Sequence, residues 1–442
     1  MQPFNTINPL LTQLGEDVMG FLNEIQLNYP QAISLGSGRP DEKYFGVQEF
    51  ATYFNRYVDA LAAASDKDKA SVVNSLGQYN RTKGIINQLL CSYLEKDEAI
   101  HVHPEDILVT VGTQESMVLS LITLCDREKD VILVEDPAYV GITHLALING
   151  YTVAPVPVQE DGISLPAITA QIEHFAKKGK KVKLVYVTPD FQNPTGSQMP
   201  LEKRHALLAL ARQHDCYLLE DNAYGDFAYD GAKLPPLKAL DKEQRVLYMR
   251  SFSKTIYPSL RLGALVAGQM VHDGEKPVAL SNLLAKTKGY ITVNTPAITQ
   301  AVMGGMLLQQ NCSLKKMNAP KVAHMQQKRD MLLSALQTYL NPQVAPWASG
   351  IRWNVPAGGF FITIHVPFDV GKDEMIECAE NYQVLFTPMR FFYLQDGGHR
   401  QIRIAFSYVP DNQITTAIER LAMYFKSKTA QNLKKYTYAF RQ

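Results

Sequence analysis

One lysine of the chain lies in surroundings that suit a reaction with an aldehyde. Lys254 follows the apolar run "RVLYM" and the two serines Ser251 and Ser253, and Arg261 comes seven residues after it. An amine at the end of a buried strand can form a Schiff base, because burial and nearby cations lower its pKa toward that of a usable nucleophile. The serine hydroxyls and the planar guanidinium of Arg261 are donors that suit a phosphate group.

Polar residues follow two other apolar runs in the same way. Asp221 ends "CYLLED", and a carboxylate at the end of a strand buried on both faces is costly unless it is paired, for example with a protonated ring nitrogen. The turn "PDFQNPTG" after "VKLVYVT" presents the amide of Asn193, although this segment could also be a rigid turn and nothing more. An aldehyde, a phosphate and a ring nitrogen that needs an acid together describe pyridoxal 5'-phosphate (PLP), which we predict as the cofactor.

Two further segments could contribute to such a site, and each also has a simpler interpretation. Gly112, Thr113 and Gln114 open a helix after "ILVTV". The start of a helix suits a phosphate, but Thr113 could be only an N-cap. Tyr139 follows "VILVED" and could either stack on a planar ring or fill the core.

The elements that must position these residues form a regular alternation. From about residue 105, short apolar runs rich in Val, Ile, Leu and Tyr alternate with helical patterns. This order predicts β-α-β units and an α/β fold in which a mainly parallel sheet lies between helices. Because ligands of such sheets bind at the carboxyl ends of the strands, we expect the residues named above to meet at one edge of the sheet.

A smaller α+β domain is expected after the alternating block. A helical pattern over about Val322–Leu340 precedes the strand-like segments "GGFFITIHV", "YQVLFTP" and "QIRIAFSYV", and a helix over Asp411–Lys426 closes the domain. We predict a large cofactor-binding domain over residues 65–310. Residues 1–64 lack the alternation and are predicted to pack with the small domain, residues 311–442, or with a partner subunit.

The overall composition excludes some classes of protein. The 442 residues carry 44 basic and 43 acidic side chains, a formal net charge of +1, which gives no indication of nucleic acid or an anionic membrane as a partner. The five cysteines are scattered and lack C-x-x-C spacing, so neither a disulfide framework nor a metal site is expected. No apolar run reaches the ~18 residues that a membrane span requires, and the N-terminus lacks the features of a secretory signal, so we expect a cytoplasmic protein.

Taken together, these motifs resemble those of the fold-type I PLP enzymes of the class I/II aminotransferase family. The resemblance runs from "ISLGSGRP" near residue 33 to "QIRIAFS" near residue 407. Its specific parts are "NPTG" followed by "EDNAY", and "SFSK" followed by "RLG". The seven-residue step from Lys254 to Arg261 is closer to the α-aminoadipate/kynurenine aminotransferase and MocR-like branch than to aspartate aminotransferase.

The resemblance implies a role for each residue of the cofactor site. Lys254 carries the internal aldimine, Asp221 pairs with the pyridinium nitrogen and Tyr139 stacks on the ring, which makes these three the expected catalytic residues. The ring hydroxyl is bound by Asn193 and Tyr224. The remaining cofactor-binding residues, around the phosphate, are Gly112, Thr113, Gln114, Ser251, Ser253 and Arg261.

The resemblance also implies a homodimer and a substrate site. Tyr79, in "GQYNRTKG", matches a tyrosine that reaches the phosphate of the partner subunit, so two subunits share their active sites. Arg403 matches the arginine that binds the substrate α-carboxylate through two hydrogen bonds, and Gly38 matches a glycine whose backbone approaches that carboxylate. Asn193 is expected to contact the substrate as well.

Two arginines depart from the pattern of the family. Arg390, in "TPMRFFY", stands with Met389 where small residues are usual, and Arg39 stands where the branch often has an apolar residue. We predict Arg390 as a substrate-binding residue that recognises an acidic side chain. The alternative, that both arginines are solvated, stays open.

The predicted activity is that of an aminotransferase, which moves an amino group from an L-amino acid to a 2-oxo acid in amino acid metabolism and biosynthesis. A β-lyase, a racemase or an amino-acid oxidase would use the same site, and the sequence separates these reactions poorly. A non-enzymatic effector-sensing domain of the MocR kind is not expected, because the segment before "ISLGSG" is too short for a DNA-binding module. The identity of the amino donor and acceptor is left open.

Overall fold

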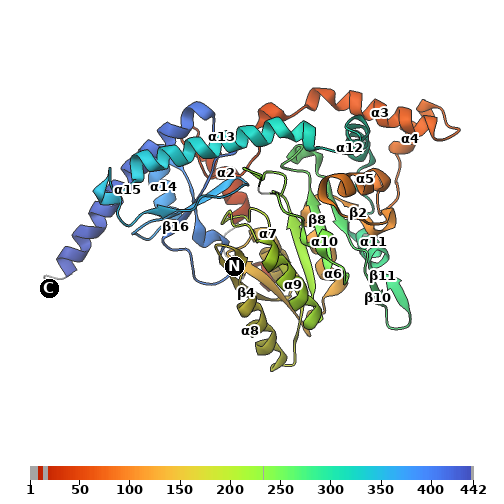
Figure 1. Ribbon diagram of the computed structural model, residues 1–442, viewed down its shortest axis with the longest axis horizontal. Coiled ribbons are helices and arrows are strands. Elements are labelled where there is room, and N and C mark those ends of the chain that lie inside the picture. Colours follow the sequence, from red (N-terminus) through yellow and green to blue (C-terminus); the bar gives the residue numbers. More distant parts are fainter. Residues whose placement is uncertain (1–7, 13–17, 232, 440–442) are drawn as a thin grey trace, which may run out of the picture.

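A large sheet lies at the centre of the computed structural model, which describes residues 8–12, 18–231 and 233–439 (Figure 1). Its eight strands, in spatial order, are β2 (Ile107–Thr110), β9 (Gly263–Val266), β8 (Val246–Ser251), β7 (Tyr217–Asn222), β6 (Lys181–Val187), β3 (Asp130–Asp136), β4 (Thr152–Gln159) and β5 (Gly162–Ile163). All of them are parallel except β9 and β5. The predicted α/β fold with a mainly parallel sheet is confirmed.

The antiparallel direction of β9, which the sequence pattern did not predict, has a local cause. Ser251 at the end of β8 pairs directly with Gly263 at the start of β9, and the segment between them forms only one short 3-10 helix, Pro258–Leu260. A parallel crossover requires a dozen or more residues and usually a helix, so this shorter segment returns the chain in the opposite direction. Lys254 therefore lies in a loop that connects two neighbouring, hydrogen-bonded strands.

Helices cover both faces of the sheet, because successive strand residues point to opposite sides. In β6, Leu184 and Tyr186 belong to one hydrophobic cluster, and Val185 and Val187 belong to another. The first cluster is covered by α6 (Gly112–Leu124), α7 (Val140–Ile148) and α11 (Leu280–Ile291). The second is covered by α8 (Leu165–Ala176), α9 (Leu201–Gln213) and α10 (Leu237–Leu240).

A second, smaller sheet forms the core of the predicted α+β domain, which is confirmed. Its antiparallel strands, in spatial order, are β12 (Arg352–Trp353), β13 (Phe361–His365), β16 (Gln401–Ala405) and β15 (Thr387–Pro388). The helices that pack here are α2 (Val18–Asn28), α13 (Lys315–Leu340), α14 (Lys372–Tyr382) and α15 (Asp411–Ala439). The long helix α13 runs from the large domain to α15 (Figure 1). A separate parallel pair, β1 (Ile33–Ser34) with β14 (Val384–Leu385), joins the N-terminal segment to this domain.

The helix α3 (Phe50–Ala63) packs away from the small domain. It lies against α12 (Ala297–Gln309), where a β-carbon on Gly305 would come within 1.7 Å of the Tyr53 carbonyl oxygen, so glycine is required for this close approach. The buried residues of α3 share a cluster with α4 (Lys69–Leu76), α5 (Asn87–Glu98) and α12. Part of residues 1–64 therefore packs with the large domain, and the exact domain boundaries stay a prediction.

The remaining elements are short. They are α1 (Pro9–Thr12), β10 (Met270–His272), β11 (Pro277–Ala279) and the 3-10 helices Glu42–Tyr44, Val47–Glu49, Pro104–Asp106, Pro346–Ala348 and Met389–Phe392. Within the part of the chain that the structure describes, no helix combines the length and the apolar character that crossing a bilayer requires.

Candidate active site

A cavity of about 540 Å³ opens at the carboxyl ends of the parallel strands, and residues of the small domain close it from the other side. Most of the predicted site residues lie in its wall, namely Gly38, Thr113, Gln114, Tyr139, Asn193, Asp221, Tyr224, Ser251, Ser253, Lys254, Arg261 and Arg403. The sheet brings many of them together because each follows the end of a neighbouring strand.

Lys254 presents its amine to this cavity. Its Nζ donates a hydrogen bond to the carbonyl oxygen of Gly38 at 3.0 Å. Burial lowers the pKa of Lys254 to about 8, and the positive charges of Arg403, Arg261 and Arg39 act in the same direction. The amine therefore reaches its neutral, nucleophilic form at a lower pH than an ordinary lysine does.

Asp221, at the end of β7, has one oxygen bound and the other open. The Tyr186 hydroxyl donates to Asp221 Oδ2 at 2.7 Å, whereas Oδ1 is buried and has no hydrogen-bond partner among the described residues. Burial raises the pKa of Asp221 to about 6, and the hydrogen bond from Tyr186 opposes this rise. A buried acceptor without a donor is costly, so Oδ1 indicates a ligand that donates a proton or a hydrogen bond.

Arg403 reaches the cavity from β16 between two aromatic rings. Its guanidinium carbon lies 4.5 Å from the centre of the Phe361 ring and 4.7 Å from that of Phe392. Its Nη1 donates to Asn193 Oδ1 at 2.8 Å, and its Nη2 donates to the Gly36 carbonyl oxygen at 2.7 Å. Burial lowers the pKa of Arg403 to about 10, which still leaves it a cation at neutral pH. A guanidinium held in this way can bind a carboxylate.

The start of α6 and the turn before β9 meet at Gly112. This residue has φ of +72°, and a β-carbon on it would lie 2.6 Å from Arg261 Nη2, so glycine is needed both for the backbone and for the guanidinium. The free N–H groups of the helix start and the charge of Arg261 together make a positive site that suits a phosphate. Gly112 itself lies behind the cavity wall. The hydroxyl residues of the wall that could add donors are Thr113, Ser251 and Ser253.

Two of the three tyrosines that line the cavity, Tyr139 and Tyr224, are predicted site residues, and their hydroxyls are protonated. The Tyr139 hydroxyl accepts a hydrogen bond from Gln114 Nε2 at 2.8 Å, and burial raises the pKa of Tyr139 to about 12. Tyr224 packs edge-on against Phe361, with ring centres 5.5 Å apart, and burial also holds its pKa above the usual value. Both hydroxyls can therefore donate a hydrogen bond at neutral pH.

Two other predicted residues do not line the cavity of this chain. Tyr79 follows α4 with 82% of its surface exposed. Arg390 is also exposed, and its Nη1 lies 3.2 Å from the position of a β-carbon on Gly371, whereas Arg39 does line the cavity. The roles expected for Tyr79 and Arg390 stay predictions, and that of Tyr79 requires a second subunit.

Among the cavity residues that the sequence interpretation missed are three that contact predicted site residues. Tyr186 lies in the strand "VKLVYVT" and pairs with Leu219, which places it on the same sheet face as Asp221. The sequence alone does not show this proximity, because it depends on the register in which the two strands pair. Phe361 and Phe392 come from the small domain, and no motif in the sequence indicates that they enclose an arginine.

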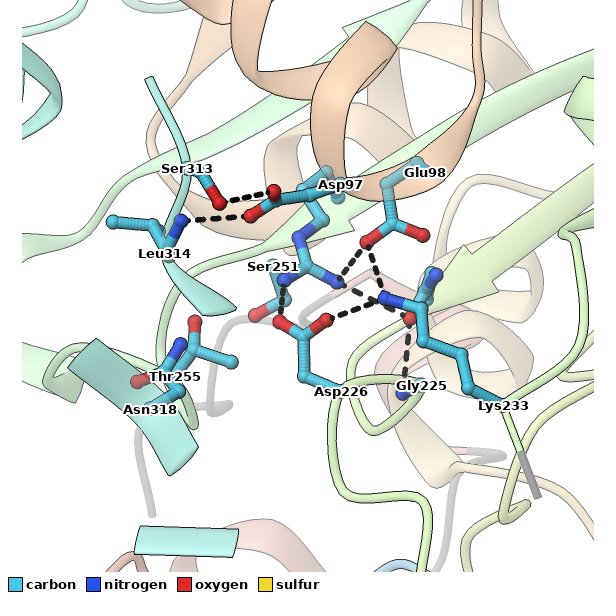
Figure 2. A network of polar contacts seen from close by, with 12 residues as sticks. Asp97, Glu98, Gly225, Asp226, Lys233, Ser251, Thr255, Ser313, Leu314 and Asn318 are labelled. Carbon is cyan, nitrogen blue, oxygen red and sulfur yellow. Dashed lines mark hydrogen bonds and ion pairs between the residues drawn. The ribbon is translucent and has the colours of Figure 1, made fainter. Parts of the chain in front are cut away.

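Next to the strand ends, a network of charges around the buried Arg250 and Glu98 joins β8 to the segment after β7 (Figure 2). Arg250, on β8, pairs with Asp226 and, at 3.4 Å, with Glu98. Lys233 pairs with the same two carboxylates at 3.0 and 3.4 Å. Burial opposes the ionisation of Asp226, but the charges of Arg250 and Lys233 outweigh it and hold the pKa of Asp226 below its usual range. The network therefore ties together two segments that carry cavity residues.

Residues 50–421 match the family described as aminotransferase class I and II. The chain belongs to this family. The aminotransferase is 41% identical over 419 residues to the (S)-3,5-dihydroxyphenylglycine transaminase of Amycolatopsis orientalis, an alignment that covers 94% of this chain and 93% of the relative. Two crystal structures are also similar. The kynurenine aminotransferase of Pyrococcus horikoshii, in complex with PMP, has a TM-score of 0.79 and 26% identity, with 96% of this chain and 97% of that chain covered. The multiple substrate aminotransferase of Thermococcus profundus has a TM-score of 0.82 and 25% identity, with 96% and 98% covered.

The predicted activity and cofactor are confirmed: the protein is a PLP-dependent aminotransferase that uses an amino acid and a 2-oxo acid. A β-lyase, a racemase, an oxidase or a sensing domain is not favoured by these relatives. The cavity also fits the cofactor by its chemistry. It offers an amine of lowered pKa, a positive site at the start of α6, and the buried, unpartnered Oδ1 of Asp221 for a protonated ring nitrogen.

Proposed function

We propose that Lys254 is the residue to which the aminotransferase attaches its cofactor, and that it also moves the proton during transamination. Bound in the cavity, PLP would supply an aldehyde for the covalent bond and a ring that accepts electrons from the substrate. The observation that carries the proposal is the Lys254 amine in the cavity among three guanidinium groups, with its pKa lowered to about 8. Lys254 Nζ, when not bound to the cofactor, would be the base that takes the proton from the substrate α-carbon and the acid that returns it at carbon C4′.

The other residues of the cavity wall hold the cofactor in this proposal. Asp221 Oδ1 would accept a hydrogen bond from the protonated nitrogen of the ring, which is supported by its burial without a partner among the described residues. Asn193 and Tyr224 bind the ring hydroxyl, and Tyr139 lies against the ring. The phosphate is bound by Thr113 and Gln114 at the start of α6, by the hydroxyls of Ser251 and Ser253, and by the guanidinium of Arg261, which packs on Gly112.

Arg403 binds the α-carboxylate of the substrate. The proposal is supported by the guanidinium held between Phe361 and Phe392, which leaves it little freedom to turn away. Gly38 contributes its backbone near the same carboxylate, and Asn193 lies within hydrogen-bond distance of Arg403. The side chain of the substrate is to be identified with a panel of amino acids. The name of the relative from Amycolatopsis makes an arylglycine a member of the panel of amino acids to be tested.

The proposal includes a homodimer with shared active sites, in which Tyr79 reaches the phosphate of the partner subunit. It is supported by large apolar side chains that are exposed near the start of α12: Tyr290, Ile291, Val293 and Ile298. Gln300 Oε1, on α12, accepts a hydrogen bond from the Ile85 backbone N–H at 2.9 Å, so the segment after Tyr79 runs beside this surface. A second copy of the chain would cover these residues together.

A cytoplasmic location and a biosynthetic role in amino acid metabolism complete the proposal. All five cysteines carry free thiols, which suits a reducing compartment.

Borohydride reduction of the holoenzyme followed by peptide mapping tests the central assignment. The cofactor should be found on Lys254, and Lys254→Ala should abolish turnover while the protein stays folded and binds the cofactor without a covalent bond. Lys321 is a stringent internal control, because it is buried outside the cavity and burial lowers its pKa to about 8 as well. A label on Lys321 or on any other lysine would contradict the proposal.

A further inference from the structure

Tyr186 has no assigned role, although it touches the most deeply buried carboxylate of the site. The side chain is fully buried on β6 and lines the cavity. Tyr186 pairs with Leu219 in the parallel register of β6 and β7, and Asp221, two residues further along, points to the same face of the sheet. The long tyrosine side chain bridges this step, so that its hydroxyl reaches Asp221 Oδ2 at 2.7 Å.

Tyr186 is the hydrogen-bond donor that the described residues supply to Asp221. Asp221 Oδ1 has no partner among them. Two other tyrosines, Tyr139 and Tyr224, lie near the carboxylate, but the Tyr139 hydroxyl is bound to Gln114 and neither tyrosine donates a hydrogen bond to Asp221. Apart from Asp221, the Tyr186 hydroxyl has one further partner among the described residues, Thr188 Oγ1, which donates a long hydrogen bond of 3.5 Å to it. The Tyr186 hydroxyl therefore donates its hydrogen bond to one oxygen of Asp221, Oδ2.

We propose that Tyr186 is a positioning residue that holds Asp221 ionised, with Oδ1 turned toward the ring nitrogen of the cofactor. This inference rests on the proposed pairing of Asp221 with that nitrogen. A hydrogen bond to a carboxylate favours its charged form, whereas burial favours the neutral form. The hydrogen bond to Oδ2 also fixes the rotation of the carboxylate plane about the Cβ–Cγ bond, and so the direction in which Oδ1 points. A neutral or rotated carboxylate would be a poorer partner for a protonated nitrogen.

Tyr186→Phe removes the donor and keeps the ring that fills the core. We expect the dissociation constant of PLP, measured by equilibrium dialysis against the apoprotein, to rise about tenfold, which corresponds to about 1.4 kcal/mol at 25 °C. We also expect kcat to fall more than KM changes, because the ionised carboxylate acts on the ring rather than on the substrate. Tyr229→Phe is the matched control: Tyr229 is also fully buried and donates its hydroxyl proton to the Gly359 carbonyl oxygen, away from the cavity. It should leave the PLP dissociation constant unchanged.

A double-mutant cycle separates positioning from a general structural role. In the Asp221→Ala background, Tyr186→Phe should have no further effect on the PLP dissociation constant, because the group through which it acts is gone. An equal effect in both backgrounds would overturn the inference, as would an unchanged dissociation constant in folded Tyr186→Phe. If the Phe variant does not fold, Tyr186→Met provides a smaller, flexible apolar side chain without a donor, and the same two outcomes apply. The borohydride label on Lys254 tells the two proposals apart, since the inference can fail while that label stays in place.

Discussion

The substitution Arg403→Lys tests the substrate site most directly. Arg403 is 5% exposed and donates from two different nitrogens, to Asn193 and to Gly36, so its orientation is set before any substrate binds. A carboxylate that meets this guanidinium can accept two parallel hydrogen bonds. Lysine keeps the positive charge but offers a point contact, and it lacks the planar group that packs between the rings of Phe361 and Phe392.

The expected magnitude follows from the number of hydrogen bonds lost. Replacement of two bonds to a charged group by one removes about 1.5–3 kcal/mol. At 1.36 kcal/mol for each factor of ten, kcat/KM should fall between about 10-fold and 150-fold. Because every substrate of an aminotransferase carries the same α-carboxylate, the loss should be nearly the same for all of them.

The assay is the half-reaction of the PLP enzyme with glutamate, 2-aminoadipate and leucine, followed by the visible absorbance of the cofactor. Arg400→Lys is the control, since Arg400 lies one residue before β16 with an exposed side chain paired to Asp369, and this change should not alter the kinetics. A loss confined to acidic substrates would refute the assignment, because it would mean that Arg403 recognises the side chain. Unchanged kinetics in folded Arg403→Lys would refute it as well.

Further predictions concern the cofactor site, the subunit contact and the substrate side chain. Asp221→Ala should lower kcat about 100-fold or more, and normal turnover would contradict the paired-charge argument. The thermal midpoint of the apoprotein should change little, because a carboxyl group whose pKa is raised to about 6 by burial adds no folding stability when it is ionised at neutral pH. The rate at which the apoprotein attaches PLP should rise as the pH passes through about 8, where Lys254 loses its proton, and a midpoint near 10.5, the usual pKa of a lysine, would count against the lowered pKa. Mixing Tyr79→Ala with Lys254→Ala subunits should partly restore activity, since one composite site per heterodimer is intact, and a competent monomer at low concentration would exclude shared sites. Arg39 lines the cavity and Arg390 does not, so both are compared as readers of an acidic side chain. Arg39→Ala or Arg390→Ala should impair glutamate and 2-aminoadipate more than leucine in steady-state kinetics at whichever position contacts the side chain, and equal losses on all three substrates, or none, would eliminate that role for the residue replaced.

The strand-end residues were predictable because local rules act on them. Lys254, Asp221 and Asn193 each follow a short apolar run, and the ends of parallel strands must meet at one edge of a sheet. The phosphate site at Gly112 follows from the same rule, combined with the free N–H groups at the start of a helix. Arg403 could be named from the sequence only through the resemblance to a family, since no local pattern distinguishes it from other arginines on strands.

The sequence by itself determined the chemistry of the site, that is, which kinds of group stand at the strand ends and which cofactor they suit. Only the tertiary structure decided the surroundings that tune those groups. The pKa of Lys254 depends on burial and on the charges of Arg39, Arg261 and Arg403. The pKa of Asp221 depends on burial and on the hydrogen bond from Tyr186 on the adjacent strand. Tertiary structure also decided that Arg39 rather than Arg390 faces the cavity. The physical reason is that hydrogen bonding and turn formation act over a few residues, whereas burial and charge interactions depend on segments that packing brings together from distant parts of the chain.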